Sequence, residues 1–211
     1  MKNIHKDETC LVMGNGPSLK DVPLKFLNQY PSFGTNRIYK MPEFTPTYYV
    51  AVNDVIIKQS IDEIKEVDAT KFIRADLANK IPGAFQLADN GRPHFSKEPL
   101  KELYEGFSVS YVCLQLAYWM GFKTVLLVGV DHKYSHNGGA NLLQAAPMDN
   151  HFTEDYYKPG EVWNTPDLIR SAKAFMLAKE AFDKARPRRK VINLTPDTGL
   201  DVFPKGDISE W

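Results

Sequence analysis

The sequence predicts an α/β protein with a single doubly wound, mostly parallel sheet of the Rossmann-like type. Short apolar runs that suit buried strands alternate with segments of helical periodicity along the chain. The run at 124–130 is apolar throughout, which is typical of a central strand covered on both faces. A turn-rich GNGPS sequence directly follows the first apolar run, as at strand-to-helix connections in this fold class.

The composition favours one globular domain spanning residues 1–211. Hydrophobic residues make up 43% and charged residues 25%, which is ordinary for a globular protein. The 26 basic and 26 acidic residues cancel, which argues against nucleic-acid binding. Cys10 and Cys113 lie in apolar runs, as expected of core thiols in a reducing compartment. With a polar N-terminus and no run of membrane-spanning length, a soluble cytoplasmic protein is expected, and self-association is left open.

The first half of the chain is expected to alternate strands with helices. The pattern predicts strands at 10–13, 32–35, 47–52 and 71–74, with helices at 22–30 and from 54 to about 65. Residues 76–106 scatter Gly, Pro, Asn and Asp with no sustained period, so an irregular insert is expected there.

Regular structure is expected to return at Ser108. Apolar residues at helical spacing run from Val109 to Met120, and Gly121 suits the helix end. A strand at 124–130, a second irregular insert at about 131–165, a long amphipathic helix over 168–182 and a strand at 190–194 follow. The tail from 195 to 211 reads as a loop.

The GNGPS loop is interpreted as the phosphate end of a nucleotide site. Gly14 and Gly16 allow positive φ and close approach of a ligand, while Pro17 suits a first helical position. Ser18 can hydrogen-bond a phosphate beside clustered backbone N–H groups. Leu19 replaces the third glycine of the dinucleotide fingerprint and no Gly-Lys-Ser/Thr follows. An ordinary turn would explain the same residues.

Polar residues fall where the predicted parallel strands end, which is where such sheets bind ligands. An amide both donates and accepts, so it suits a base, a ribose or a sugar, whereas a turn role is the ordinary explanation of each asparagine alone. Hydroxyls at a helix start suit a phosphate. The predicted nucleotide-binding residues are Gly14, Asn15, Gly16, Pro17, Ser18, Asn36, Arg37, Asn53, Asp54, Ser108, Ser110, Gly129, Asp131 and His132.

The loop from 131 to 157 holds three of the five histidines. His132 and His136 have a spacing that could ligate a metal on a helix, but the following NGG opposes a helix, so no metal site is expected. His151 lies in a polar loop and suits a general base, although a surface histidine without chemistry fits equally. The predicted catalytic residues are His151, Lys133 and Tyr134, the last two as contacts of the departing phosphate.

The sequences GNGPSLKD, FGTNRIY, AVND and LLVGVDHKY resemble those of the Rossmann-like bacterial sialyltransferases that modify surface lipooligosaccharide. Together with DNHF and NLTPDTGLDVFP, the pattern is still more similar to the MptE-like family. Its relatives include archaeal hydroxymethylpterin diphosphokinase and the central domain of flagellin-glycosylation factors. The resemblance runs from about Thr9 to Pro204.

The resemblance implies a nucleotide site, which in the sialyltransferases holds a cytidine monophosphate sugar without a metal. Three departures matter. Gly106 and Phe107 stand where those enzymes carry an arginine, and Tyr134 matches their phosphate-binding tyrosines only loosely. Their catalytic histidine matches a position nearer Tyr156 than His151. His151 is the histidine left in that region, and the base role is assigned to it. The positions implied to bind the nucleotide are Gly14, Asn15, Gly16, Ser18, Asn36 and Asn53.

The leading hypothesis is a glycosyltransferase of surface glycan synthesis, with a nucleotide sugar such as a cytidine monophosphate nonulosonic acid as donor and a glycan or lipid-linked acceptor. It needs no cofactor. The alternative is a diphosphokinase that moves a diphosphate from ATP to a pterin-like alcohol. It requires magnesium, for which Asp54, Asp131 and Asp149 would supply carboxylates. A non-catalytic nucleotide-sugar-binding module is the third hypothesis, consistent with the missing arginine.

Overall fold

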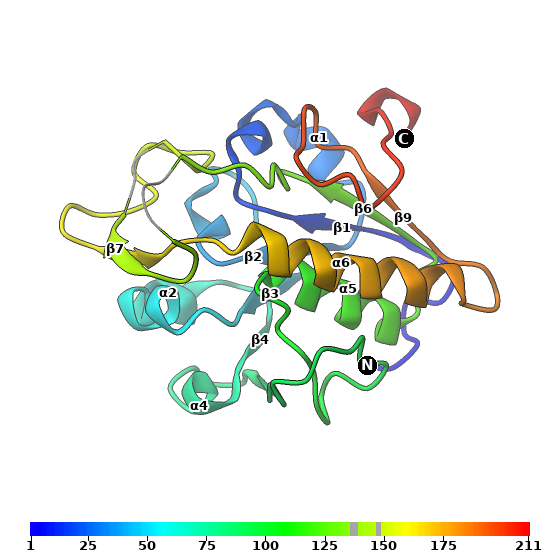
Figure 1. The fold of residues 1–211 in the computed structure, drawn as a ribbon, viewed down its shortest axis with the longest axis horizontal. Coiled ribbons are helices and arrows are strands. Elements are labelled where there is room, and N and C mark those ends of the chain that lie inside the picture. Colours follow the sequence, from blue (N-terminus) through cyan, green and yellow to red (C-terminus); the bar gives the residue numbers. More distant parts are fainter. Residues whose placement is uncertain (136–138, 147–148) are drawn as a thin grey trace.

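The computed structural model of the chain describes residues 1–135, 139–146 and 149–211. Seven strands form one sheet in the order β5-β4-β3-β2-β1-β6-β9, and every neighbouring pair is parallel (Figure 1). The predicted α/β fold is therefore confirmed. The strands are β1 (Thr9–Met13), β2 (Ser32–Thr35), β3 (Tyr48–Ala51), β4 (Thr70–Arg74), β5 (Phe85–Leu87), β6 (Thr124–Val128) and β9 (Lys190–Asn193).

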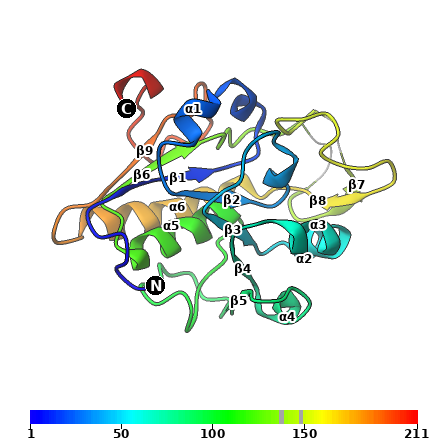
Figure 2. The ribbon, with the colours of Figure 1, turned by 180° about the vertical axis from the view of Figure 1, so that it is seen from behind.

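Helices cover both faces of the sheet because successive strand residues point to opposite sides. Val12 belongs to the apolar cluster under two long helices, α5 (Val109–Met120) and α6 (Leu168–Asp183). Its neighbour Met13 belongs to the cluster on the other face. Figure 2 shows that second face with its short helices. They are α1 (Leu24–Leu27), α2 (Asp54–Gln59), α3 (Ile61–Glu66) and α4 (Ala75–Ala78).

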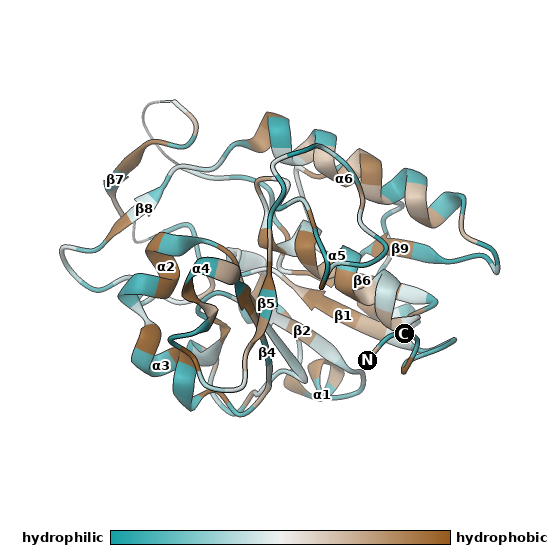
Figure 3. Ribbon diagram, turned by 90° about the horizontal axis from the view of Figure 1, so that it is seen from below, coloured by the Kyte–Doolittle hydropathy of each residue, from teal (hydrophilic) through white to brown (hydrophobic). Residues whose placement is uncertain are grey.

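β6 is buried along its whole length, as its continuous apolar sequence predicts. It pairs with β1, whose other neighbour is β2, so the strand order changes direction between β1 and β6. In an open parallel sheet the connections on the two sides of such a point diverge and leave a crevice beyond the strand ends. In Figure 3, β1 is apolar brown near the middle of the molecule, while α6 alternates brown and teal.

The predicted helix boundaries hold where a capping residue marks them. α5 follows Ser108 and is terminated by Gly121, the residue after Met120, whose φ is 99°. The helix expected from 54 to about 65 is interrupted at Ser60, which ends α2 and precedes α3. The helix expected at 22–30 is reduced to α1, and the 3-10 helix η1 (Pro17–Asp21) precedes it.

Both segments expected to be irregular contribute strands. The 76–106 segment contains β5, which extends the sheet beside β4. The 131–165 segment contains β7 (Leu143–Ala145) and β8 (Val162–Asn164), an antiparallel pair outside the main sheet. Two further 3-10 helices are η2 (Ile38–Lys40) and η3 (Ile208–Glu210). None of the helices in the described ranges has the length and apolar character needed to cross a bilayer.

Candidate functional site

A cleft of about 340 Å³ lies beyond the carboxyl ends of β1, β2, β3 and β6, at the point where the strand order changes direction. The N-terminus of α5 and the β7–β8 segment form its other walls. Most of the predicted site residues meet there although they come from separate parts of the chain. Those that line the cleft are Gly14, Asn15, Gly16, Asn36, Asn53, Asp54, Ser108, Ser110, Gly129, Asp131, His132, Lys133, Tyr134 and His151.

The glycines of the first loop are explained by packing within the protein. A Cβ on Gly14 would lie 2.2 Å from the carbonyl oxygen of Gly129, and the Gly16 N–H donates to that same oxygen at 2.9 Å. A Cβ on Gly16 would lie 1.9 Å from Oδ2 of Asp131. The loops after β1 and β6 therefore lie too close together for side chains at these two positions.

Ser18 is turned toward Asp131 and does not line the cleft. Its hydroxyl donates to Oδ2 of Asp131 at 2.8 Å, and its backbone N–H donates to Oδ1 at 3.3 Å. The carboxylate thus occupies the position at the start of η1 that the sequence analysis gave to a phosphate. Pro17 also does not line the cleft, and an anion at this position would meet a carboxylate. The phosphate contacts predicted for Ser18 and Pro17 stay predictions, which this arrangement does not favour.

Asn15 and Asn36 each hold a side-chain carbonyl oxygen that has no hydrogen-bond partner within the described residues and is buried. Asn15 is 9% exposed, and its amide nitrogen donates to the carbonyl and hydroxyl oxygens of Thr35 at 3.0 and 2.8 Å. The Thr35 hydroxyl donates to Met13, so it accepts from Asn15, which fixes the orientation of that amide. A buried acceptor without a hydrogen bond destabilises the folded chain, so we expect a donor group of a ligand to pair with these two oxygens.

Asn53 and Asp54 line the cleft but also have structural partners. Oδ1 of Asn53 accepts from the N–H of Ile56 and caps α2. Asp54 pairs with Lys58 at 2.6 Å, and that hydrogen bond together with the nearby Arg74 lowers the pKa of its carboxyl. Their positions at the strand end agree with the predicted site, and helix capping accounts for one of the two amide atoms of Asn53.

The N-terminus of α5 opens into the cleft without an acidic residue in its first turn and without a side-chain cap. Ser108 and Ser110 lie there, and the first N–H groups of a helix have no partner within it. The preceding Phe107 has a φ of 59° and is 39% exposed. The guanidinium of Arg170, from α6, lies 4.0 Å from the centre of its ring. A guanidinium therefore lies near the start of α5 although the chain has Gly106 and Phe107 there, but it is paired with the carboxylate of Asp167.

The pKa of His151 is lowered to about 3, first by burial and then by the charge of Arg37. Its ring stacks on that of Tyr156, with centroids 3.7 Å apart and an angle of 7° between the planes. Nδ1 is buried and has no partner within the described residues. His151 lines the cleft as a neutral ring, and a group with so low a pKa is a weak proton acceptor at neutral pH.

The three residues that follow Asp131 face the cleft in different environments. His132 has a φ of 52°, its Nε2 lies 3.0 Å from the hydroxyl of Ser171, and burial lowers its pKa. Lys133 is exposed. Tyr134 as a whole residue is 37% exposed, but desolvation of its hydroxyl raises the pKa to about 12, so the hydroxyl stays protonated at neutral pH. A lysine and a phenol at this position are suitable donors to a phosphate.

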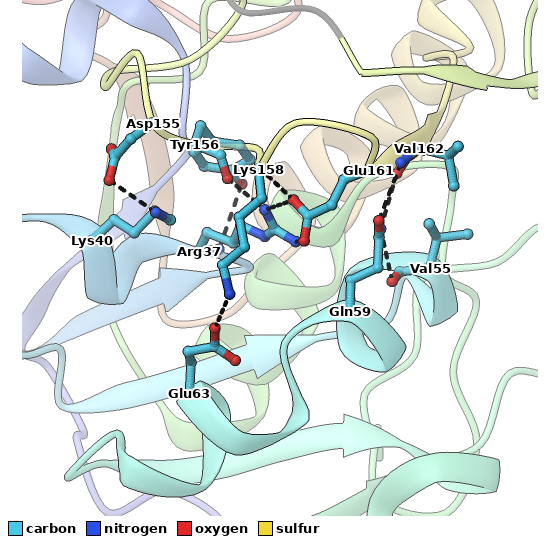
Figure 4. A network of polar contacts seen from close by, with 10 residues as sticks. All are labelled: Arg37, Lys40, Val55, Gln59, Glu63, Asp155, Tyr156, Lys158, Glu161 and Val162. Atoms are coloured by element: carbon cyan, nitrogen blue, oxygen red, sulfur yellow. Dashed lines mark hydrogen bonds and ion pairs between the residues drawn. The ribbon is translucent and has the colours of Figure 1, made fainter.

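Arg37 is 1% exposed and does not line the cleft. Its guanidinium binds both carboxylate oxygens of Glu161 and the backbone carbonyl of Tyr156 (Figure 4). It also lies 4.9 Å from the centre of the Tyr157 ring. The nucleotide contact predicted for Arg37 stays a prediction, which this buried ion pair does not favour. The residue instead ties the 150–164 segment, which carries His151, to the end of β2.

Glu105 also lines the cleft, although it is not among the predicted site residues. It precedes α5, and burial raises its pKa to about 7, an effect that Arg74 opposes and three nearby aspartates reinforce. Those aspartates are Asp89, Asp76 and Asp54. In the sequence Glu105 lies in the irregular 76–106 segment, where nothing distinguishes it from other charged residues. Only the tertiary fold brings Glu105 to the cleft at the strand ends, so its position could not be predicted from the sequence.

The carboxylates proposed for magnesium do not form one group. Asp54 pairs with Lys58, Asp131 accepts from Ser18, and Asp149 is an exposed residue of the loop. Within the described ranges no three or more His, Cys, Asp or Glu side chains are placed to hold a metal ion. The described residues therefore do not fit a magnesium site. His136, the second histidine of the possible zinc pair, lies outside those ranges.

Comparisons with known proteins agree with the expected resemblance. The family model "6-hydroxymethylpterin diphosphokinase MptE-like" matches residues 43–137. The fold is similar to the solved structure of the sialyltransferase CstII from Campylobacter jejuni in complex with a substrate analogue, cytidine-5'-monophosphate. That similarity has a TM-score of 0.53 at 15% identity and covers 95% of this chain and 85% of the other. Among curated protein sequences, none matches this chain.

Proposed function

We propose that the chain is a transferase that uses a nucleotide-activated sugar, with a cytidine monophosphate nonulosonic acid as the first donor to test. The observation that carries this proposal is the pair of unpartnered carbonyl oxygens of Asn15 and Asn36 at one cleft. They can accept hydrogen bonds from ribose hydroxyls or from the amino group of a base. The structural similarity to a sialyltransferase that binds cytidine-5'-monophosphate supports the choice of donor.

In this proposal the cleft binds the donor along its length. Asn15 and Asn36 hold the nucleoside, while Ser108, Ser110 and the first N–H groups of α5 face the phosphate. Lys133 and Tyr134, which also line the cleft, stabilise the phosphate as it departs. The stacked, neutral ring of His151 offers a flat surface to the sugar, and this replaces the base role expected of it.

A thermal-shift screen tests the proposal. The protein is heated with CMP, UMP, GMP, AMP and ATP, each with and without magnesium. Selective binding at 100 times the dissociation constant stabilises the folded chain by about 2.7 kcal/mol. Stabilisation by CMP without magnesium supports the proposed donor. If no nucleotide stabilises the chain, the proposal is wrong.

The second candidate is a pterin-type diphosphokinase, and the family match over residues 43–137 favours it. ATP would then stabilise the chain, and chelation of magnesium would abolish the effect. Asp54 and Asp131 already pair with Lys58 and Ser18, and the described residues include no group of three or more side chains that could hold a metal ion, which does not favour this candidate. The screen distinguishes the two by the base that binds and by its dependence on magnesium.

A glycan or a lipid-linked sugar is proposed as the acceptor. A non-catalytic nucleotide-sugar-binding module would occupy the same cleft, and donor turnover separates it from an enzyme. Release of CMP from CMP-N-acetylneuraminic acid by the wild-type chain would exclude the binding module.

A further inference from the structure

We propose that Glu105 is the group that accepts the proton of the acceptor hydroxyl. This inference rests on the proposed transferase function. Glu105 lines the cleft directly before α5, whose N-terminus is proposed to face the donor phosphate. A carboxylate beside that position is near the bond that breaks.

The carboxyl group of Glu105 is not engaged in a stabilising contact with the described residues. It takes part in no hydrogen bond or ion pair with the described residues, in contrast to Asp54 and Asp131, the other cleft carboxylates discussed above. The nearby Arg74 is already held, since its Nε donates to Asp76 at 2.6 Å and its Nη1 donates to the carbonyl of Val52 at 3.0 Å. Glu105 is therefore free to exchange a proton with a ligand.

The surroundings of Glu105 suit proton transfer near neutral pH. It is partly buried, and charged groups face it from four elements: Arg74 at the end of β4, Asp76 on α4, Asp89 after β5 and Asp54 on α2. Burial and the three aspartates together raise the pKa to about 7 against the effect of Arg74. A base whose pKa is near the working pH is effective. His151, with a pKa of about 3, is not.

The reaction is balanced as a single displacement. The acceptor oxygen forms a bond to the anomeric carbon while its proton passes to a carboxylate oxygen of Glu105. The bond between that carbon and the phosphate oxygen breaks, and its electron pair leaves with the nucleotide monophosphate. With water as acceptor the same steps give hydrolysis of the donor.

The test measures CMP release from CMP-N-acetylneuraminic acid between pH 5 and 9, for the wild type and for Glu105→Gln. Removal of a general base costs about 100-fold or more in rate. We expect that loss at pH 8, with the dissociation constant for CMP changed by less than about 3-fold. The rise of the wild-type rate around pH 7 should disappear in Glu105→Gln. Glu102→Gln, an exposed residue of the same segment, is the matched control.

A carbon-13 titration of the glutamate carboxyl groups adds a measurement that needs no substrate. One signal should titrate near pH 7 in the wild type and be missing in Glu105→Gln. If CMP binds and is released from the donor but Glu105→Gln keeps the wild-type rate and pH profile, this inference is wrong and the proposed function stands. If neither CMP binding nor donor turnover occurs, the proposed donor is wrong and the inference fails with it. A Glu105 signal that titrates below pH 5 also overturns the inference.

Discussion

The guanidinium of Arg37 binds both carboxylate oxygens of Glu161, at 2.5 and 2.9 Å, across 124 positions of sequence. Their side chains are 1% and 13% exposed. Removing one partner of a buried ion pair leaves an uncompensated charge and costs about 3–5 kcal/mol. We therefore expect Glu161→Ala to lower the free energy of unfolding by about that amount, measured by urea denaturation.

A second ion pair of the same segment serves as the control. Lys158 lies 2.8 Å from Glu63, but the two side chains are 61% and 38% exposed (Figure 4). Ion pairs between exposed side chains contribute little to stability, so Lys158→Ala should have a small effect. Equal losses in Glu161→Ala and Lys158→Ala would contradict the role given to the buried pair.

The close approach of the loops after β1 and β6 predicts a coupled pair of substitutions. A Cβ on Gly16 would lie 1.9 Å from Oδ2 and 2.6 Å from Cγ of Asp131. Gly16→Ala should cost about 1–3 kcal/mol through overpacking, and Asp131→Ala should relieve most of that cost. The double-mutant cycle in urea should therefore be non-additive. Gly14→Ala meets the backbone oxygen of Gly129, so Asp131→Ala should not rescue it.

Much of the fold follows from local sequence patterns. The strand ends, with Asn15, Asn36 and Asn53 at one edge, follow from apolar runs bounded by turn residues. The long helix α5 follows from its apolar spacing between Ser108 and Gly121. These features depend on residues that are close together in the chain, so they can be predicted from a single sequence.

The differences between prediction and structure come from contacts between distant segments. The side chain of Gln59 exchanges hydrogen bonds with the backbone of Val162 close to Ser60, where the expected helix is interrupted. Arg37 was expected to contact a nucleotide at the end of a strand, but in the structure the 150–164 segment covers it. Asp131 reads as a ligand contact until Ser18 approaches it. No residue spacing in the sequence predicts these contacts between distant segments.

The unpartnered oxygen of Asn36 predicts a selective loss of nucleotide affinity. Asn36 has a φ of 48°, which glycine adopts without strain, so Asn36→Gly removes the amide and keeps the backbone. Loss of one hydrogen bond of about 1.4 kcal/mol should weaken CMP binding about tenfold, measured by calorimetry. Asn3→Gly is the control, because Asn3 has a φ of 57° and does not line the cleft. Unchanged affinity in Asn36→Gly would remove this residue from the proposed site.

His151 predicts acid sensitivity of the fold. Its pKa is about 3 in the folded chain against an ordinary 6.5, so the unfolded chain takes up a proton between these values and the folded chain does not. Stability from this residue is present above pH 6.5 and falls by about 1.4 kcal/mol per pH unit below it. Between pH 7.5 and 5 the wild type should lose about 2 kcal/mol more than His151→Phe. Parallel pH profiles of unfolding would contradict the buried, neutral state of this ring.

The raised pKa of Glu105 predicts that stability changes with pH in the opposite direction, over an overlapping range of pH. Its pKa is about 7 in the folded chain against an ordinary 4.5, so the folded chain holds a proton that the unfolded chain releases. This stabilisation is full below pH 4.5 and is lost as the pH rises through 7. Above pH 7 the folded chain contains the ionised, partly buried carboxylate of Glu105. Glu105→Gln removes that charge, so the variant should be more stable than the wild type at pH 8, by on the order of 1–2 kcal/mol, and gain less at pH 5. Urea denaturation at both pH values, with Glu102→Gln as the exposed control, measures the difference.

A variant that is stabilised at pH 8 while it loses donor turnover would show that the charge is kept for chemistry at the expense of stability. A variant destabilised at both pH values would instead mean that the carboxyl holds the cleft together.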